Sequence, residues 1–176
     1  VSFGNVSFNI LKEIFTRNIE NLQYFPIGNI DIGSFVVDLP FKEKIEDSVN
    51  GNQIRHTRQT PSLKLWHING MLESFSDKRV GFTFHETSAL TTSEINILNQ
   101  LNLIFVTSQY TKQVFEESGA KNVVYCPIGF DSTHFYNVGG NKLDAIVFGL
   151  FGKWESRKNT IRILKLWSKL FGNNKK

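Results

Sequence analysis

Short apolar runs alternate with helix-like segments between residues 62 and 129, and this alternation constrains the fold more than any other feature. The stretches "SLKLWHING", "KRVGFTFHET", "LIFVT" and "NVVYCPIG" each contain a run with the length and composition of a buried strand. Strands separated by helices of about 10–15 residues form a parallel sheet with helices on both faces. The sequence therefore predicts an α/β fold built on such a sheet.

Capping signals place the helices between these strands. Thr91-Thr92-Ser93-Glu94 is a capping-box pattern, which predicts a helix running through Leu98 and Leu101. Ser108 is expected to cap the next helix, and Gly119 is expected to end it.

The first third of the chain is less regular. Apolar residues at near-helical spacing predict a helix over residues 7–22. The stretch "GSFVVDLP" predicts a short strand that Pro40 closes, with a polar helix or loop after it. Residues 48–61 lack periodicity and are expected to form a loop.

The last part of the chain predicts the start of a second unit. Residues 131–142, "DSTHFYNVGGNK", suit a linker, and "AIVFGLFG" predicts a fresh strand before a basic turn and an amphipathic helix. We therefore expect one domain over residues 1–140, and a linker with the first strand–helix unit of another over residues 141–176. Because the chain opens on Val1 in an expected loop, we expect both ends to be cut.

Composition narrows the functional classes. A net charge of +4 and a pI near 9.2 fit an anionic ligand such as a nucleotide, but no stretch combines clustered bases with stacking aromatics, so we expect no nucleic acid. A single cysteine, Cys126, excludes an internal disulfide and indicates a reducing compartment. No apolar run approaches the roughly 20 residues of a membrane span, and no signal peptide is evident, so we expect a cytoplasmic protein without a transmembrane segment.

Polar residues at the ends of two predicted strands are the first candidates for a site, because ligands of open α/β sheets bind at the carboxyl ends of strands. His67 follows one strand, and His85 with Glu86 follows the next. Imidazoles can hydrogen-bond sugar hydroxyls or a departing oxygen, and a His–Glu pair can transfer a proton. Alternatively, His67 is a satisfied core histidine beside Trp66.

Other polar residues lie away from these two strand ends. Gly4 and Asn5 lie in an expected loop before the first helix, whose amides could face an anion or a sugar hydroxyl; the alternative is an ordinary N-cap by Asn5 or Ser7. His56 and His134 are expected to face solvent. Two strand-end histidines without a third ligand at set spacing predict no metal site.

The basic turn near the C-terminus is a further candidate. Gly152 would allow close approach of the backbone, and Lys153 with Lys158, expected at the start of the last helix, could cradle a diphosphate. The pattern is not a Walker loop, because Val147 stands where the first glycine belongs. The alternative is a basic, solvated turn.

These features together resemble a known family. Residues 98–135, "LNQLNLIFVTSQYTKQVFEESGAKNVVYCPIGFDSTHF", resemble the end of the N-terminal domain of family 4 (GT-B) glycosyltransferases. The residues that match the family pattern are Leu98, Asn99, Ser108, Phe115, Ser118, Gly119, Pro127, Gly129, Asp131 and Phe135. "FGLFGKWESRKN" resembles the start of the family's second domain, which is usually G-R-x-x-x-x-K-G after a strand, and "SFGN" resembles its glycine-containing first loop.

The resemblance implies a Rossmann-like GT-B N-terminal domain followed by a truncated second Rossmann-like domain. It implies hexose transfer from a nucleoside-diphosphate sugar, with retention and without a metal or other cofactor, to an unknown glycan, lipid or protein acceptor. Lys153 and Lys158 would neutralise the leaving diphosphate, His67 or His85 would contact the donor sugar or position the acceptor, and the Gly4–Asn5 loop would close over the cleft.

The sequence also departs from the family pattern. Lys153 takes the place of an arginine, which replaces a planar fork by a point charge, and Asn159 takes the place of a glycine. The family's E-x7-E motif has no counterpart in these residues, so we expect this piece to be inactive alone. The alternative function is a non-catalytic nucleotide- or carbohydrate-binding Rossmann-like domain.

Overall fold

The computed structural model describes residues 3–31, 38–140, 144 and 146–172. The chain divides into two compact units, residues 1–135 and 136–176, each of which is described by itself. The boundary between the units falls inside the polar segment 131–142 that the sequence predicts as a linker.

The first unit is built on a four-stranded parallel sheet. Its strands are β1 (Ser62–Leu65), β2 (Arg79–Thr83), β3 (Leu103–Val106) and β4 (Val123–Tyr125), hydrogen-bonded in the order β1-β2-β3-β4. All three strand pairs are parallel, so the carboxyl ends of all four strands lie at one edge of the sheet. The predicted α/β fold with a parallel sheet is thus confirmed.

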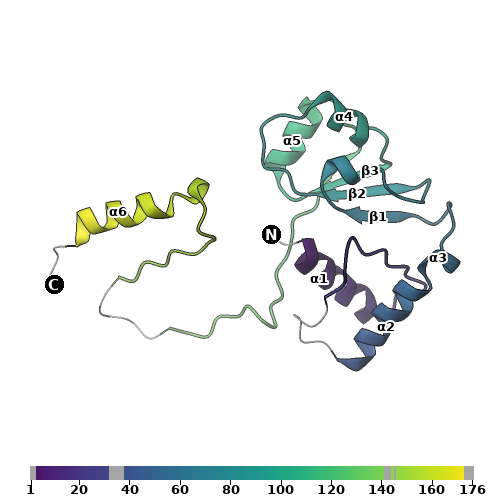
Figure 1. Ribbon diagram of the computed structural model, residues 1–176, viewed down its shortest axis with the longest axis horizontal. Helices are drawn as coiled ribbons and strands as arrows, with labels where there is room; N and C mark the ends of the chain where they lie inside the picture. Colours follow the sequence, from purple (N-terminus) through teal and green to yellow (C-terminus); the bar gives the residue numbers. More distant parts are fainter. Residues whose placement is uncertain (1–2, 32–37, 141–143, 145, 173–176) are drawn as a thin grey trace. The chain divides into compact units, whose positions relative to one another are not determined.

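Helices flank this sheet. Helix α4 (Thr92–Leu98) connects β2 to β3, and α5 (Gln109–Glu117) connects β3 to β4. Figure 1 shows α4 and α5 on one side of the strands, with α1 (Phe3–Thr16) and α2 (Leu39–Asn50) on the other. A short 3-10 helix, η1 (Ile68–Gly70), follows β1, and α3 (Asn52–Arg55) follows α2. The arrangement is compatible with a Rossmann-like fold.

The main core fills the space between the sheet and the helices α4 and α5. It joins Ile104, Val106 and Val123 of the sheet to Leu98 of α4 and Phe115 of α5. Burying each such side chain contributes about 1.5–3 kcal/mol to folding. This core holds the loops at the carboxyl ends of β2 and β3 in place.

The predicted helix caps are confirmed. The Thr91 hydroxyl accepts from the Glu94 amide while the Glu94 carboxylate accepts from the Thr91 amide, which completes the capping box. The Ser108 hydroxyl accepts from the Thr111 amide at the start of α5. Gly119 adopts φ +91°, a left-handed conformation that suits glycine and ends that helix.

The N-terminal elements differ from the prediction. Helix α1 spans Phe3–Thr16 rather than residues 7–22, because Asn18 adopts φ +53° and the Ile19 amide returns to the Ile14 carbonyl, which ends the helix early. The strand predicted in "GSFVVDLP" falls mostly on residues 32–37, which lie outside the described residues.

The predicted loop over residues 48–61 is wrong in its first half, where α2 continues and α3 forms. The Arg55 guanidinium donates two hydrogen bonds to Asp47, at 2.7 and 2.8 Å, and the Asn52 amide donates to the Tyr24 carbonyl. The Asn52 contact joins positions 28 apart and the Arg55 contact spans 8, both beyond the three- or four-residue spacing of helical periodicity, which therefore does not reveal them.

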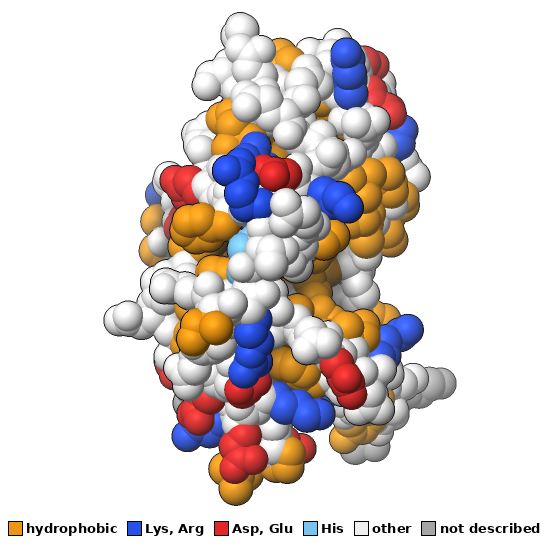
Figure 2. All heavy atoms as spheres, turned by 90° about the vertical axis from the view of Figure 1, so that its right-hand side faces the viewer, with side chains coloured by type: hydrophobic (Ala, Val, Ile, Leu, Met, Phe, Trp, Pro, Cys, Tyr) orange, Lys and Arg blue, Asp and Glu red, His pale blue; other side chains and the backbone are white. Residues whose placement is uncertain are grey.

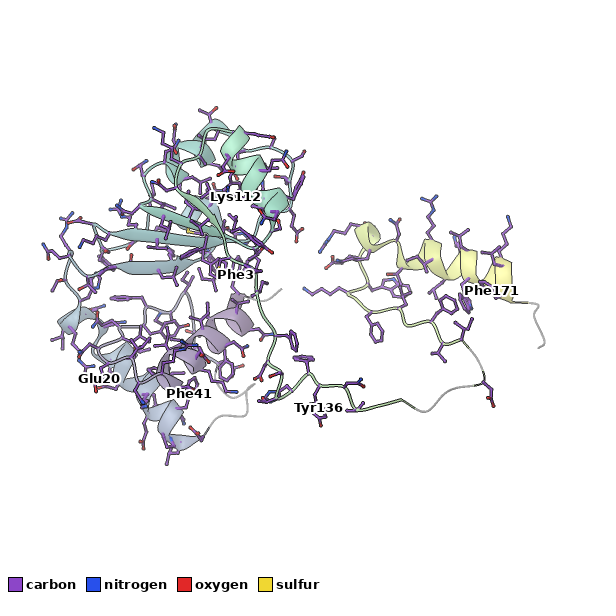
Figure 3. All side chains as sticks on the ribbon, turned by 180° about the vertical axis from the view of Figure 1, so that it is seen from behind. Phe3, Glu20, Phe41, Lys112, Tyr136 and Phe171 are labelled. Carbon is purple, nitrogen blue, oxygen red and sulfur yellow. The ribbon has the colours of Figure 1, made fainter. Side chains whose placement is uncertain are left out.

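The second unit consists of an irregular segment, the 3-10 helix η2 (Ser156–Lys158) and α6 (Thr160–Phe171). The strand predicted at residues 145–152 is wrong over 146–152, where the chain has no ladder partner among the described residues. Instead, the Phe148 ring packs against Trp167 of α6, with ring centroids 4.5 Å apart. Figure 3 shows Phe171, which is also on α6, next to the segment that carries Phe148. None of the side chains of α6 is buried.

Among the described residues, each helix is too short or too polar to cross a membrane.

Candidate functional site

The carboxyl ends of β1 and β2 carry the two histidines that the sequence singles out. His67 lies two residues beyond Leu65, the last residue of β1, and forms the N-cap of η1. His85 lies two residues beyond Thr83, the last residue of β2. The predicted position of both residues at strand ends is confirmed.

His67 belongs to an aromatic cluster formed by Phe3, Trp66, His67 and Phe84. The Phe3 ring lies 4.8 Å from the His67 ring, 5.1 Å from Trp66 and 5.4 Å from Phe84, measured between centroids. His67 lies beside Trp66, but it is exposed, so the alternative of a core histidine is wrong. Each aromatic pair contributes about 0.5–1.5 kcal/mol beyond burial, so the cluster fixes the start of α1 against the ends of β1 and β2.

His85 is half-buried and faces the α5 side of the sheet. Its ring packs edge-on against the fully buried Phe115, with centroids 5.2 Å apart. Its Nε2 lies 2.7 Å from the Thr87 hydroxyl, and its backbone carbonyl accepts a hydrogen bond from the buried Thr111 hydroxyl. His85 is therefore held by both its ring and its backbone.

Two carboxylates lie near His85. Glu86 is exposed and follows it directly in the chain. The pKa of Glu94 lies below its ordinary value, chiefly because its carboxylate accepts the Thr91 amide at 2.8 Å, with smaller contributions from the Thr91 hydroxyl and from the charge of His85. His85 thus has two carboxylates in its neighbourhood, one that follows it in the chain and one in the first turn of α4.

The two histidines do not form a single pair. Within the described residues, the rings of His67 and His85 make no contact with each other. Phe3 connects their surroundings, because its ring contacts both His67 and Phe84, the neighbour of His85. The edge of the sheet therefore presents one imidazole within the aromatic cluster, that of His67, and a second, that of His85, packed against Phe115.

The predicted loop around Gly4 and Asn5 is wrong over the described residues. Both residues are exposed in the first turn of α1, which begins at Phe3. The Asn5 carbonyl accepts the Asn9 side-chain amide at 2.8 Å, so neither Asn5 nor Ser7 is an N-cap. The packing of Phe3 in the aromatic cluster accounts for the early start of the helix, and the role of Gly4 and Asn5 in ligand binding stays a prediction.

Gly152, Lys153 and Lys158 lie in the second unit. Both lysines are exposed, and Lys158 is the last residue of η2 rather than part of α6. Arg157 pairs with Glu155 at 2.8 Å, whereas neither lysine has an ion-pair partner among the described residues. Gly152 adopts φ +146° with open space around it. The turn thus presents two ammonium groups to solvent.

The other two histidines have different surroundings. His134 is exposed, as predicted, and its Nδ1 lies 3.0 Å from Asp131. The pKa of Asp131 is far below its ordinary range, first because of hydrogen bonds from Thr133, then from His134 and Lys12. His56 is half-buried against Phe25, so the expectation that it faces solvent is wrong.

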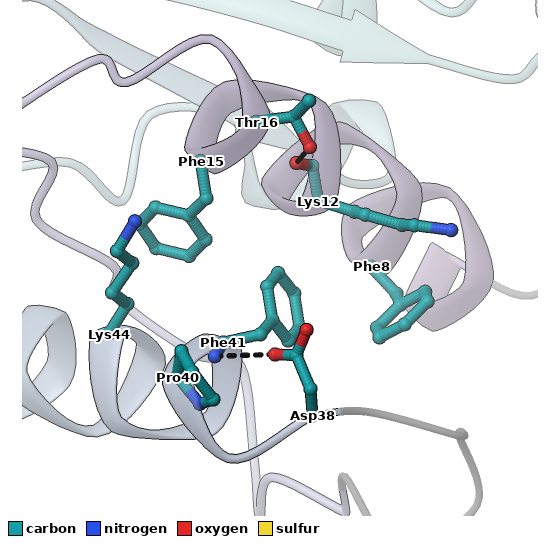
Figure 4. A pocket seen from close by; sticks show the side chains of 8 residues that line it. All are labelled: Phe8, Lys12, Phe15, Thr16, Asp38, Pro40, Phe41 and Lys44. Atoms are coloured by element: carbon teal, nitrogen blue, oxygen red, sulfur yellow. Dashed lines mark hydrogen bonds between the residues drawn. The ribbon is translucent and has the colours of Figure 1, made fainter.

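A hollow of about 240 Å³ lies between α1 and α2. Figure 4 shows Phe8, Phe15 and Phe41 around it, with Lys12 and Lys44 at its sides. The acid on its wall, Asp38, accepts the Phe41 amide as the N-cap of α2, and the Lys44 ammonium lies 5.9 Å from the centre of the Phe15 ring. These polar groups have structural roles, and the hollow contains none of the predicted site residues.

Comparisons with known protein families, with curated proteins and with solved structures found no match. Among the described residues, no three His, Cys, Asp or Glu side chains gather closely enough to hold a metal ion. The metal-free mechanism stays a prediction, because it rests on the family resemblance.

Sequence reasoning missed the aromatic cluster. The signal was present as a repeated aromatic–histidine dipeptide, Trp66-His67 and Phe84-His85, at the ends of successive strands. The sheet pairs Leu65 with Phe82, so the two dipeptides lie just beyond the strand ends and are offset by one position. The Phe3 ring contacts one ring of each dipeptide, but Phe3 is remote in sequence and leaves no local pattern.

Proposed function

We propose that this chain is part of a GT-B glycosyltransferase that transfers a sugar from a nucleoside-diphosphate sugar with retention and without a metal. The proposal depends on the order and spacing of the family-like residues over 98–135, which span the end of α4, β3, α5, β4 and the segment after β4. The parallel sheet supports it, because such sheets bind ligands at the edge where His67 and His85 lie.

The charge and exposure of the individual residues support the roles proposed for them. Lys153 and Lys158, which lack ion-pair partners among the described residues, would neutralise the diphosphate as it leaves. His67 is exposed and would hydrogen-bond the sugar or orient the acceptor. His85, with Glu86 beside it, would move or hold a proton.

The test is turnover by the natural full-length protein supplied with UDP-glucose, GDP-mannose and other nucleoside-diphosphate sugars. The readout is release of the nucleoside diphosphate. We expect Lys153→Met with Lys158→Met to lower kcat by about 10²–10³, since preorganised charges that meet a developing anion contribute effects of that size. Lys169→Met on α6 is the matched control and should leave kcat within about twofold.

The same experiment distinguishes sugar transfer from the alternative function, which is that of a non-catalytic nucleotide- or carbohydrate-binding domain. That alternative is favoured by the aromatic cluster at the ends of β1 and β2, in which His67 is exposed and the aromatic rings are half-buried. Binding of a nucleoside-diphosphate sugar without release of the nucleoside diphosphate would support it. Wild-type kcat in the double lysine variant would contradict the role given to the basic turn, and absence of both binding and turnover would contradict both functions.

A further inference from the structure

A cavity of about 650 Å³ opens at the amino ends of the strands, the opposite end of β1 and β2 from His67 and His85. Its walls come from the segment before α2, from α3 and the residues after it, and from the β1–β2 connection. Sites that bind small organic molecules have volumes of about 300–1,000 Å³. The cavity is therefore large enough for one such molecule.

Two guanidinium groups give this cavity its charge. Arg58 donates from Nε and Nη2 to Asp77, at 3.2 and 2.9 Å, and is largely neutralised by it. Arg79, the first residue of β2, uses only Nε, which donates to the Ser76 carbonyl at 2.9 Å. Within the described ranges, its two Nη groups have no hydrogen-bond partner. One positive charge thus remains, on a planar fork suited to a carboxylate.

Aromatic rings form the apolar part of the wall. Phe25 and Phe75 have ring centroids 6.1 Å apart, and Phe75 is 74% exposed. The His56 ring packs edge-on against Phe25 at 5.3 Å. The cavity thus combines two large aromatic rings with a guanidinium whose Nη groups are unpaired. These groups match a ligand that has both a flat apolar body and an anionic group.

His56 adds a polar group without a partner. Its Nε2 is shielded from solvent and has no hydrogen-bond partner among the described residues. A buried polar atom left unpaired is destabilising, because it loses its hydrogen bonds to water without a replacement. Because this atom is shielded, a molecule in the cavity can reach it only after the neighbouring side chains shift, whereas the Gln53 amide lines the cavity and offers a polar contact.

We propose that this cavity binds a small organic monoanion, a carboxylate or sulfonate carried on a flat apolar ring system. Arg79 pairs with the anionic group, and Phe25 and Phe75 flank the ring system. The single net charge favours a monoanion over a nucleotide diphosphate. This site is separate from the basic turn of the proposed transfer reaction, so each can fail without the other.

The test is a titration of the 176-residue chain with naphthalene-2-carboxylate, followed by amide chemical shifts in two-dimensional ¹H–¹⁵N NMR spectra. The neutral isostere naphthalene-2-carboxamide is titrated in parallel. We expect saturable shifts at Gln53, Ser74 and Arg79 with a Kd of about 1 mM or tighter, and binding of the carboxamide at least about tenfold weaker.

Arg79→Met keeps the aliphatic stem but removes the charge, and it should weaken binding of the carboxylate about tenfold or more. Arg17→Met is the matched control, because Arg17 is an exposed arginine in the turn after α1 that pairs with Glu13. Equal affinity for the carboxylate and the carboxamide in the wild-type chain would overturn the proposal, even if Arg79→Met failed to fold. Absence of saturable shifts at the cavity residues at about 10 mM ligand would overturn it as well.

Discussion

Gly81 occupies a position in β2 where a single methyl group has measurable consequences. A Cβ there would lie 2.8 Å from Leu101 Cδ1 and 3.2 Å from Met71 Sδ. Leu101 and Met71 are only 4% and 1% exposed, so neither side chain has free space into which it can move. Overpacking of this kind costs about 1–3 kcal/mol.

The substitution also has a stabilising effect, which partly offsets the cost of overpacking. Replacing glycine by alanine restricts the unfolded chain and stabilises a protein by about 0.4–1 kcal/mol where the native conformation allows alanine. The overpacking term is larger, so Gly81→Ala should lower the free energy of unfolding by about 1–2 kcal/mol. Because Met71 follows η1, whose N-cap is His67, the same change should displace the turn that carries His67.

Urea denaturation followed by circular dichroism measures this effect. With an m-value of about 2 kcal/mol/M, the midpoint should fall by about 0.5–1 M. Gly129→Ala is the control, since nothing lies within 4 Å of its Cβ position, and it should leave stability unchanged or slightly raised. In a Leu101→Val background, which removes Cδ1, Gly81→Ala should cost less. Equal midpoints for Gly81→Ala and Gly129→Ala would refute the packing argument.

Three further predictions concern the cap of α4, the segment after β4 and the basic turn. Thr91→Ala should lower the free energy of unfolding by about 0.5–2 kcal/mol at pH 7. Because the folded-state pKa of Glu94 is lowered, its contribution to stability is present above its unfolded pKa and is lost as the pH falls through the folded pKa. The urea midpoints of wild type and Glu94→Gln should therefore differ at pH 7 and converge in acid, below that lowered pKa. Thr133→Val should raise the pKa of Asp131 in a carboxyl NMR titration, whereas Ser132→Ala should not, because Thr133 donates the dominant hydrogen bonds. Gly152→Ala should shift amide resonances of residues 150–158, since φ +146° disfavours alanine and the site is otherwise open.

The sequence predicts the sheet and its helices well because their signals are local. The capping box at Thr91 and the cap at Ser108 involve residues three positions apart, and both occur as predicted. The strand ends follow from short apolar runs, so His67 and His85 could be placed at one edge of the sheet from the sequence.

The remaining features depend on contacts between distant segments. The packing of Phe3 at the ends of β1 and β2 starts α1 early and places Gly4 and Asn5 in a helix. The partly buried environment of His56 depends on Phe25, which is 31 positions earlier by residue number.

The predicted strand at residues 146–152 fails for a related reason. An apolar run becomes a strand only where another strand satisfies its backbone groups. Here the run packs against its own helix through Phe148 and Trp167. Hydrophobic periodicity shows only that a segment tends to bury one of its faces. The segment that it packs against then determines whether a strand forms.

The twelve-residue helix α6 exposes all of its apolar side chains to some degree. A helix of this length is marginal in water on propensity alone. Its helicity in solution should therefore respond to whatever shields those side chains, and Trp167 could act as an internal fluorophore for that process. Once Trp66 and Trp154 are replaced by phenylalanine, a blue shift in its emission would signal that the face has been covered.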